Sequence, residues 1–286
     1  MANSTTTTLA SLISPIVQEA IFTASEQSIM MGLVRQFQVP AGTGNTARVP
    51  IYPAATAHSL TEGTDMAGTS ADQAITTTTK DIAMTESGIM TVLSDMISDQ
   101  SPQNIIAHLG RVFGGALGSK IDSDLMGLFT GFSTSMGGGA GVELTTTHIA
   151  NVVATLRANA APTDNGVYYG VFHPYQLATI KSALTSGFTG LTGGELSNAA
   201  MRNGYVGNLL GVQIFENSNI SIDGSGDSVG AIFSKEALGL AMAHNMKVTT
   251  QYQASKRGTD VVATARYGVS ELVDTYGVKV TSDAVL

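Results

Sequence analysis

The stretch YPAATAHSLTEGTDMAGTSADQAITTTTKD, residues 52–81, decides the fold of this chain because it cannot build a core of its own. Its sizeable aliphatic side chains are only Leu60, Met66 and Ile75, set among threonine, serine, alanine, glycine and acids. Loops of such length are uncommon inside compact domains and are usually either functional or disordered. The sequence on both sides has to indicate what a polar stretch of this kind is for.

The residues that flank the polar stretch are typical of β-strands. Residues 46–53 alternate polar and apolar side chains, and Pro50 and Pro53 fit an edge strand because proline cannot donate to a ladder. The return segment is rich in β-branched threonine, which favours a pleated ribbon. We expect a two-stranded ribbon over 46–88 with a loose tip near 60–73. An isolated hairpin is only marginally stable in water, so this ribbon needs a partner surface.

The composition indicates a soluble protein that meets other protein. Hydrophobic residues make up 43% of the 286 residues and charged residues only 13%, which is less charge than a globular surface normally carries. The absence of cysteine excludes disulfides, thiolate metal sites and cysteine nucleophiles. The N-terminus lacks the pattern of a signal peptide, and no apolar run is long enough for a membrane span. We expect a protein made in a cytoplasm that has no membrane partner.

The charge distribution argues against a dedicated nucleic-acid binder. The formal net charge is −8, and residues 1–100 hold nine acids against three bases. Lys256 and Arg257 form the only adjacent basic pair in the sequence. Phosphate contacts supply most of the affinity for nucleic acid, and this chain has no basic tract to make them.

Two helices are predicted in the first half of the chain. Ser14-Pro15 is typical of a helix start, and apolar residues then recur at three- and four-residue steps up to Ala24. The apolar stripe of this amphipathic helix packs either on its own domain or on a neighbouring copy. The clearest helix spans 102–128, about 40 Å at 1.5 Å per residue. The glycine-rich segment 131–141 after it is typical of a joint between domains.

Helices and strands alternate beyond the joint. We expect a helix over 147–160, a buried strand over 166–173 and a helix beginning at Pro174. The fold class is therefore α+β. The remaining expected strands are 209–217, 228–234 and the antiparallel closing segments 247–253, 259–273 and 276–283.

No stretch of the sequence has the spacing of a catalytic or metal-binding motif. The five histidines are at least 25 residues apart, which excludes a local metal-binding pair. GGALGSK (114–120) lies inside the predicted helix and lacks the spacing of a phosphate loop. Asp122 and Asp124 resemble calcium ligands, but Met126 stands at the next ligand position, so a surface turn is favoured. We expect no catalytic, cofactor-binding or metal-binding residues, and no enzyme.

The order of these parts resembles that of the major capsid proteins of tailed bacteriophages, which have the Hong Kong 97 fold. The likeness is carried further by GVFHPYQLATI (170–180), YVGNLLGVQIFEN (205–217) and RYGVSELVDTYGVKV (266–280). The resemblance implies an N-terminal arm (1–45), an extended β-hairpin called the E-loop (46–88), a peripheral domain with a long spine helix (89–144), an axial domain (145–245) and return strands of the peripheral domain (246–286).

The resemblance also implies a function and partners. Copies of the chain would form the hexamers and pentamers of an icosahedral shell that holds double-stranded DNA without specific recognition. The shell would be part of a virion assembled in the host cytoplasm, together with a portal, a separate scaffolding protein and room for a decoration protein. Two alternatives stay open: an encapsulin-like compartment shell, and a small α/β enzyme with a flexible lid at 54–80.

Some members of the family crosslink an E-loop lysine to an asparagine of a neighbour. This chain has no hairpin lysine before Lys80 and no asparagine in 246–286, so we expect that chemistry to be absent. The acids of the hairpin tip are expected to meet basic residues of the next copy. The candidate contact residues between subunits are Ile16, Ile21, Phe22, Arg48, Glu62, Asp65, Asp72, Lys80, Lys256, Arg257 and Arg266.

Overall fold

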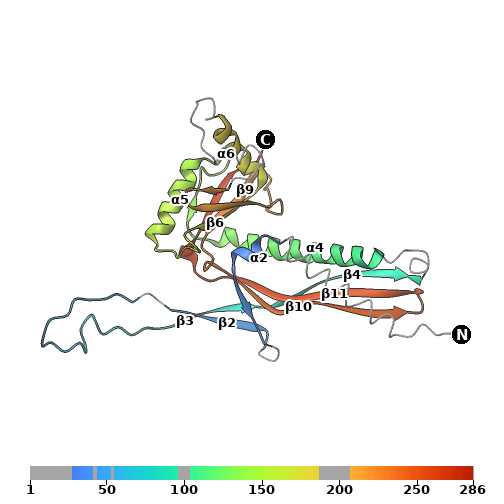
Figure 1. The fold of residues 1–286 in the computed structure, drawn as a ribbon, viewed down its shortest axis with the longest axis horizontal. Helices are drawn as coiled ribbons and strands as arrows, with labels where there is room; N and C mark the ends of the chain where they lie inside the picture. Colours follow the sequence, from blue (N-terminus) through green and yellow to red (C-terminus); the bar gives the residue numbers. More distant parts are fainter. Residues whose placement is uncertain (1–27, 41–43, 53–54, 96–103, 187–206, 286) are drawn as a thin grey trace.

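The computed structural model describes residues 28–40, 44–52, 55–95, 104–186 and 207–285 (Figure 1). Its α-helices are α2 (Met30–Leu33), α4 (Asn104–Gly127), α5 (Thr146–Ala158) and α6 (Pro174–Ser186), with short 3₁₀ turns η1 (Leu128–Gly131) and η3 (Asp274–Tyr276). Its strands are β1 (Arg35–Gln38), β2 (Thr46–Ile51), β3 (Thr78–Ala83), β4 (Thr85–Ser94), β5 (Ser135–Met136), β6 (Tyr168–Phe172), β7 (Asn208–Leu209), β8 (Val212–Glu216), β9 (Asp227–Phe233), β10 (Leu238–Gln253), β11 (Gly258–Glu271) and β12 (Gly277–Asp283).

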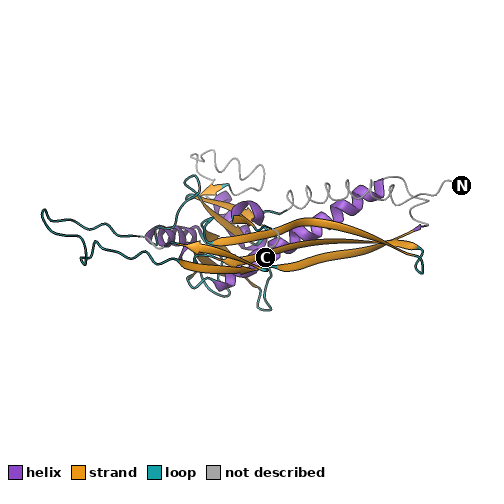
Figure 2. Cartoon of the chain, turned by 90° about the horizontal axis from the view of Figure 1, so that it is seen from below, coloured by secondary structure: helices purple, strands orange, loops and turns teal. Residues whose placement is uncertain are grey.

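A long four-stranded sheet and the helix α4 form one elongated half of the molecule. The strand order is β1-β10-β11-β4, with β1 parallel to β10 and the other pairs antiparallel. Figure 2 shows α4 lying lengthwise over one face of these strands. The predicted helix over 102–128 is confirmed, although residues 102–103 lie outside the described residues.

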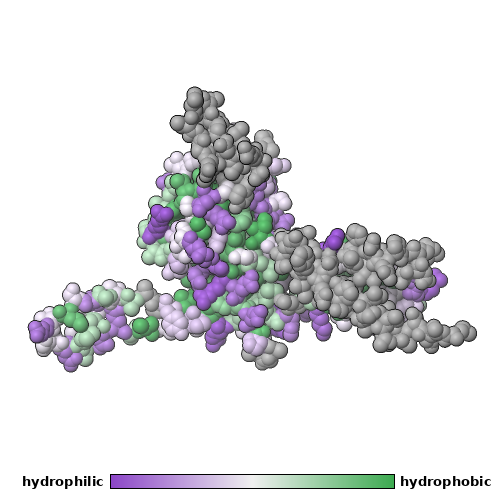
Figure 3. All heavy atoms as spheres, in the orientation of Figure 1, coloured by the Kyte–Doolittle hydropathy of each residue, from purple (hydrophilic) through white to green (hydrophobic). Residues whose placement is uncertain are grey.

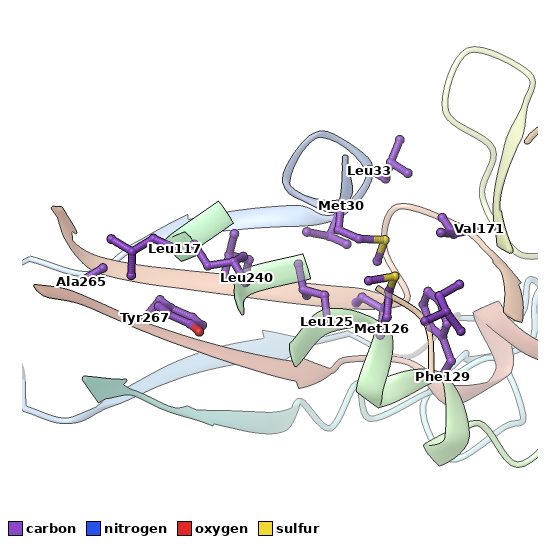
Figure 4. Packing of buried hydrophobic residues seen from close by; sticks show 14 of the residues in the cluster. Met30, Leu33, Leu117, Leu125, Met126, Phe129, Val171, Leu240, Ala265 and Tyr267 are labelled. Atoms are coloured by element: carbon purple, nitrogen blue, oxygen red, sulfur yellow. The ribbon is translucent and has the colours of Figure 1, made fainter. Parts of the chain in front are cut away.

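The apolar stripe of α4 forms the main core. Leu117, Leu125 and Met126 of α4 pack with Leu240 of β10 and Tyr267 of β11, each at most 5% exposed (Figure 4). Full burial of a large apolar side chain stabilises a fold by about 1.5–3 kcal/mol. The apolar residues that recur at three- and four-residue steps in the sequence therefore lie on the face of α4 that packs on the sheet.

A second, six-stranded sheet stands beside the first and carries α5 and α6 (Figure 1). Its order is β5-β12-β9-β6-β8-β7, with β6 and β8 parallel. Thr145 begins α5 with a capping box, in which its side chain accepts from the His148 backbone and the His148 ring accepts from Thr145. The helices and strands predicted for 147–234 are confirmed with bounds shifted by a few residues.

The hairpin formed by β2 and β3 is shorter than predicted. Its register runs from Thr46 opposite Ala83 to Ile51 opposite Thr78, and residues 55–77 contain no strand. After the buried Met84 the chain enters β4, which pairs with β11 of the long sheet. The prediction of one ribbon over 46–88 is therefore wrong beyond Ala83. The physical reason is that the buried Met84 separates β3, which pairs with β2, from β4, which pairs with β11 of the long sheet. Strand propensity alone does not indicate which partner a strand pairs with.

The last two strands are antiparallel to their partners, as predicted, but they belong to different sheets. β11 and β12 do not pair with each other, because β12 runs antiparallel to β9 in the six-stranded sheet and β11 lies between β10 and β4. η3 separates them and redirects the chain. The final strand therefore ties the C-terminal end of the chain to the sheet that carries α5 and α6.

Candidate functional site

The base of the hairpin carries an ion pair on its exposed side. Arg48 of β2 and Asp81 of β3 are register partners, and Arg48 Nε lies 2.9 Å from Asp81 Oδ1. This hydrogen bond and the guanidinium charge hold the pKa of the Asp81 carboxyl below its usual value. Exposed pairs of this kind add little to stability. Arg48, predicted as a contact between subunits, is thus already paired within its own hairpin.

The other side of the hairpin base is buried against the body. Val49 of β2 and Ile82 of β3 form a small apolar cluster with Ala241 of β10 and with Leu272. Gly268 of β11 lies directly under β3: a Cβ there would be 2.3 Å from the Ala83 carbonyl oxygen. Only glycine permits this approach, so the crossing of β3 over β11 fixes where the hairpin leaves the body.

Beyond this base, the hairpin loop (residues 55–77) projects away from the rest of the chain (Figures 1 and 3). Figure 3 shows it as polar residues with isolated hydrophobic ones. Leu60, Met66 and Ile75 are 61%, 50% and 60% exposed, respectively. Within the single chain, the larger apolar side chains of the loop are thus left in contact with solvent.

The two arms of the hairpin loop are joined by a side chain rather than a ladder. The Gln73 amide accepts from the Thr56 backbone N–H at 3.0 Å and donates to the Thr56 carbonyl at 2.7 Å. It thereby makes the pair of bonds that an opposite strand residue would make. The loop keeps a hairpin-like course without a regular sheet.

The acids of the tip lie together, apart from the predicted cations. Asp65 accepts from the Ala67 N–H and Asp72 from the Gly68 N–H, both at 3.1 Å, so each carboxylate shapes a turn and stays exposed. Glu62 is also exposed on the tip.

The predicted cations have partners in their own chain or stand elsewhere. Lys256 Nζ lies 3.6 Å from Asp260 Oδ2, and Arg257 follows it in the turn between β10 and β11. Figure 1 shows this turn at the opposite end of the long sheet from the hairpin. Arg266 Nη2 donates to Asn45 Oδ1 at 2.5 Å, beside the start of the hairpin. A single chain therefore does not bring the acidic tip to these cations.

The other predicted contact residues are placed as follows. Lys80 is exposed on β3. Burial and the Asp274 carboxylate raise the pKa of Glu271, and the positive charge of Lys80 acts in the opposite direction. Ile16, Ile21 and Phe22 lie outside the described residues.

Sequence reasoning missed one buried polar junction. Asp122 is not in a surface turn but inside α4, at 1% exposure, where its carboxylate accepts hydrogen bonds from the segment at Ser28 and from Asn217. The signal was available: Asp122 lies one turn from Gly118 and one turn from Met126, on the buried flank of the helix. A carboxylate on the buried face of a helix needs hydrogen-bond donors as partners.

The described part of the chain holds no arrangement typical of an active site. One groove of about 680 Å³ lies between α4, β1 and β10 and is lined mainly by Met, Leu, Ile, Phe and Val side chains, with His244 as its one titratable residue. Among the residues that the structure describes, no group of three or more His, Asp or Glu side chains could hold a metal ion. None of the described helices is long and apolar enough to span a membrane.

Comparisons with known proteins identify the fold. No family model matches the sequence, and no curated protein matches it. A chain from the head structure of Helicobacter pylori bacteriophage KHP40 is 13% identical with a TM-score of 0.67, over 90% of this chain and 92% of that chain. A chain from Mycobacterium phage Che8 is 20% identical with a TM-score of 0.66, over 89% and 91%. A chain from the capsid structure of cyanophage P-SCSP1u is 16% identical with a TM-score of 0.64, over 88% and 87%.

These likenesses cover nearly the whole length of both partners at low sequence identity. The chain therefore has the α+β Hong Kong 97 fold, as its sequence predicted.

Proposed function

We propose that this chain is the major capsid protein of a tailed bacteriophage. Copies assemble into the hexamers and pentamers of an icosahedral shell that encloses a double-stranded DNA genome. One observation carries the proposal: the hairpin loop 55–77 is exposed, has no core of its own and projects from a fold shared with chains of a phage head and a phage capsid. The proposed working parts are the arm (1–45), the E-loop, the peripheral domain and the axial domain (145–245). The E-loop, predicted over 46–88, is the hairpin 46–83, because β4 belongs to the long sheet. The peripheral domain, predicted over 89–144 and 246–286, then includes β4 and β11 but not β12, which lies in the six-stranded sheet.

In this proposal the main partner of the chain is another copy of itself. The loop of one subunit lies on the next, and such a head-to-tail contact closes a ring when its rotation closes. The proposed further partners are a portal, a separate scaffolding protein and a decoration protein. The shell holds DNA without specific recognition, which suits a chain of 22 acids and 14 bases. The protein acts in the virion after assembly in the host cytoplasm.

The acidic tip supplies part of the proposed contact. Glu62, Asp65 and Asp72 stand on a loop that carries no lysine or arginine between residues 55 and 77. Their proposed partners on the neighbour are Lys256, Arg257 and Arg266. Each exposed pair is worth only about 0–1 kcal/mol, so the effect depends on the many copies in a shell. The apolar residues of the loop supply the rest by leaving water.

Deletion of residues 56–78 tests the proposal. We expect a soluble protein with an unchanged free energy of unfolding, because the deleted residues are almost all exposed, but no closed particles in negative-stain electron microscopy. A variant with a Gly/Ser segment of the same length in place of 56–78 controls for strain in the shortened hairpin and should also form no particles. Normal shells from either variant would refute the proposed role of the loop. Native particles that hold a protein cargo and no DNA would instead favour a compartment shell.

A further inference from the structure

A buried carboxylate joins three parts of the molecule that are far apart in sequence. Asp122 of α4 accepts four hydrogen bonds: at Oδ1 from Ser28 Oγ (2.5 Å) and Met30 N (3.1 Å), and at Oδ2 from Ile29 N (3.1 Å) and Asn217 Nδ2 (3.0 Å). Ser28 and Met30 belong to the first described segment of the chain, and Asn217 follows β8 of the six-stranded sheet. We call these five residues the Asp122 junction.

The junction is enclosed on every side. Asp122 is 1% exposed, Ser28 7% and Asn217 8%. Asn217 is fixed in turn, because its N–H donates to the Phe172 carbonyl at 3.1 Å and its Oδ1 accepts from the Asn219 N–H at 2.9 Å. A displacement of Asp122 therefore disturbs the end of β6 as well as the N-terminal segment.

No cation compensates the charge of Asp122 among the described residues. On its own helix, Lys120 Nζ lies 2.6 Å from Asp124 Oδ1, so these two charges face each other. Beyond Asn217, Asp223 accepts from backbone N–H groups of its own turn, and Asp227 accepts from the Gly141 N–H. Residues 28–34, which contain α2, carry no charged side chain. Hydrogen bonds alone hold the carboxylate, and a buried carboxylate that loses them is costly.

We propose that Asp122 is a positioning residue that couples the N-terminal arm to the axial domain. Its carboxylate fixes the point at which the chain before Ser28 joins the body, and the same carboxylate holds Asn217. When the junction opens, both segments are released together, because each donor loses the acceptor that it shares with the others. This coupling is a property of the single subunit and goes beyond the proposed assembly function, since it can be measured without shells.

The junction has a distinctive pH dependence. Burial raises the pKa of Asp122 above the ordinary value of 3.8, while the bonds from Ser28, the backbone and Asn217 oppose that rise. Opening the junction exposes Asp122 to water and returns its pKa to the ordinary value. Protonation therefore favours the closed junction: this stabilisation is complete below the ordinary pKa and is lost as the pH rises through the raised one. We expect the junction to loosen as the pH rises from the ordinary carboxyl pKa through the raised pKa of Asp122.

Amide hydrogen exchange of the unassembled full chain tests the coupling. In D122N the new amide N–H groups face the Ile29 and Asn217 donors, so protection should fall by about tenfold or more in peptides at both 28–34 and 217–221. N217D should do the same, because two carboxylates then face each other. The double variant D122N/N217D exchanges the amide and the carboxylate and restores their mutual hydrogen bond, so it should recover part of the protection in both peptides; recovery is incomplete because the Ile29 N–H still faces an amide N–H at position 122. D124N is the matched control and should change neither peptide by more than about twofold.

The outcomes separate the proposal from a merely structural role. In the wild type, protection at both peptides should fall as the pH rises above the ordinary carboxyl pKa, once intrinsic exchange rates are divided out, and D122N should abolish that dependence. Loss at only one peptide, or a double variant that stays unprotected, would overturn the coupling. If D122N fails to fold, S28A serves instead, because it removes only the hydroxyl donor. S28A should lower protection at both peptides. An effect confined to 28–34 would contradict the proposed coupling.

Discussion

Gly268→Ala tests whether the close crossing of β3 over β11 sets the direction in which the hairpin projects from the body. An added Cβ would stand 2.3 Å from the Ala83 carbonyl oxygen and 3.0 Å from Ile82 Cγ2. Ordinary contact begins near 3.4 Å, so β3 must move away from β11 by about 1 Å. Ile82 is fully buried in the cluster that holds the hairpin base, so β3 cannot move without disturbing that packing.

The expected cost of this substitution follows from overpacking. Forcing one extra carbon into a packed site typically costs about 1–3 kcal/mol, and we expect the free energy of unfolding to fall by that amount. The shift should also redirect the loop 55–77, since its only attachment is through β2 and β3. We therefore expect fewer closed particles at concentrations where the wild type assembles.

The assay is urea unfolding of the unassembled chain, followed by electron microscopy of the same preparation. Gly224→Ala is the matched control, because its Cβ would meet nothing within 4 Å and its backbone is not in the left-handed region. The control should unfold within about 0.5 kcal/mol of the wild type and assemble normally. If Gly268→Ala behaves like the control in both measurements, the close crossing of β3 over β11 does not set the direction of the hairpin, and this prediction is wrong.

Two further predictions concern titration and charge. Burial and the Asp164 carboxylate raise the pKa of Tyr169 to about 12, so the stabilisation from its neutral hydroxyl is present below pH 10.0 and is lost as the pH rises through that raised value. Tyr169→Phe should remove this part of the alkaline loss of stability in pH-dependent urea unfolding, and an unchanged curve would contradict the assignment. Reversing Glu62, Asp65 and Asp72 to lysine should lower the yield of shells at low salt, with partial rescue when Lys256, Arg257 and Arg266 are reversed to glutamate. Light scattering at two ionic strengths measures this, and equal yields for all variants would exclude the charge contact.

The elements that the sequence predicted well are those whose burial follows a simple period. The stripe of α4 and the apolar strand β6 are examples, because each has one environment along its whole length: α4 presents one face to the sheet, and all five residues of β6 are buried. Pro174 marked the start of α6 by local chemistry that does not depend on the rest of the fold. In such segments local and global preferences agree.

The pairing of strands could not be predicted in the same way. Within residues 78–94 a single residue, Met84, separates β3 from β4, yet these strands belong to two different sheets. Met84 is 3% exposed and its N–H donates to the Asn45 carbonyl at 2.9 Å. That contact joins residues on opposite arms of the hairpin, and no spacing within either arm reveals it. The pairing of β12 with β9 is likewise not indicated by any spacing within 276–283.

Asp122 shows a different limit of sequence reasoning. Its spacing from Asp124 was compared with a calcium loop, whereas the informative comparison was with its helical neighbours Gly118 and Met126, which are both buried. The phase of the helix indicates that the carboxylate is buried. It does not indicate which donors meet it, because Ser28 and Asn217 are more than ninety residues away in the chain.

The hairpin has a base that is buried against its own subunit and a loop that is exposed to solvent. The base is buried, and one glycine allows it to cross β11 closely, so its direction is set by the subunit alone. The loop has exposed apolar side chains and carboxylates that bond only to their own turns, so its order depends on what it touches. The two perturbations therefore fail in different ways. Deleting 56–78 removes the contact and leaves subunit stability unchanged, whereas Gly268→Ala keeps every contact residue and misplaces it at a cost in stability. A loop that served as an enzyme lid would act on its own body, and neither change would then alter association between copies.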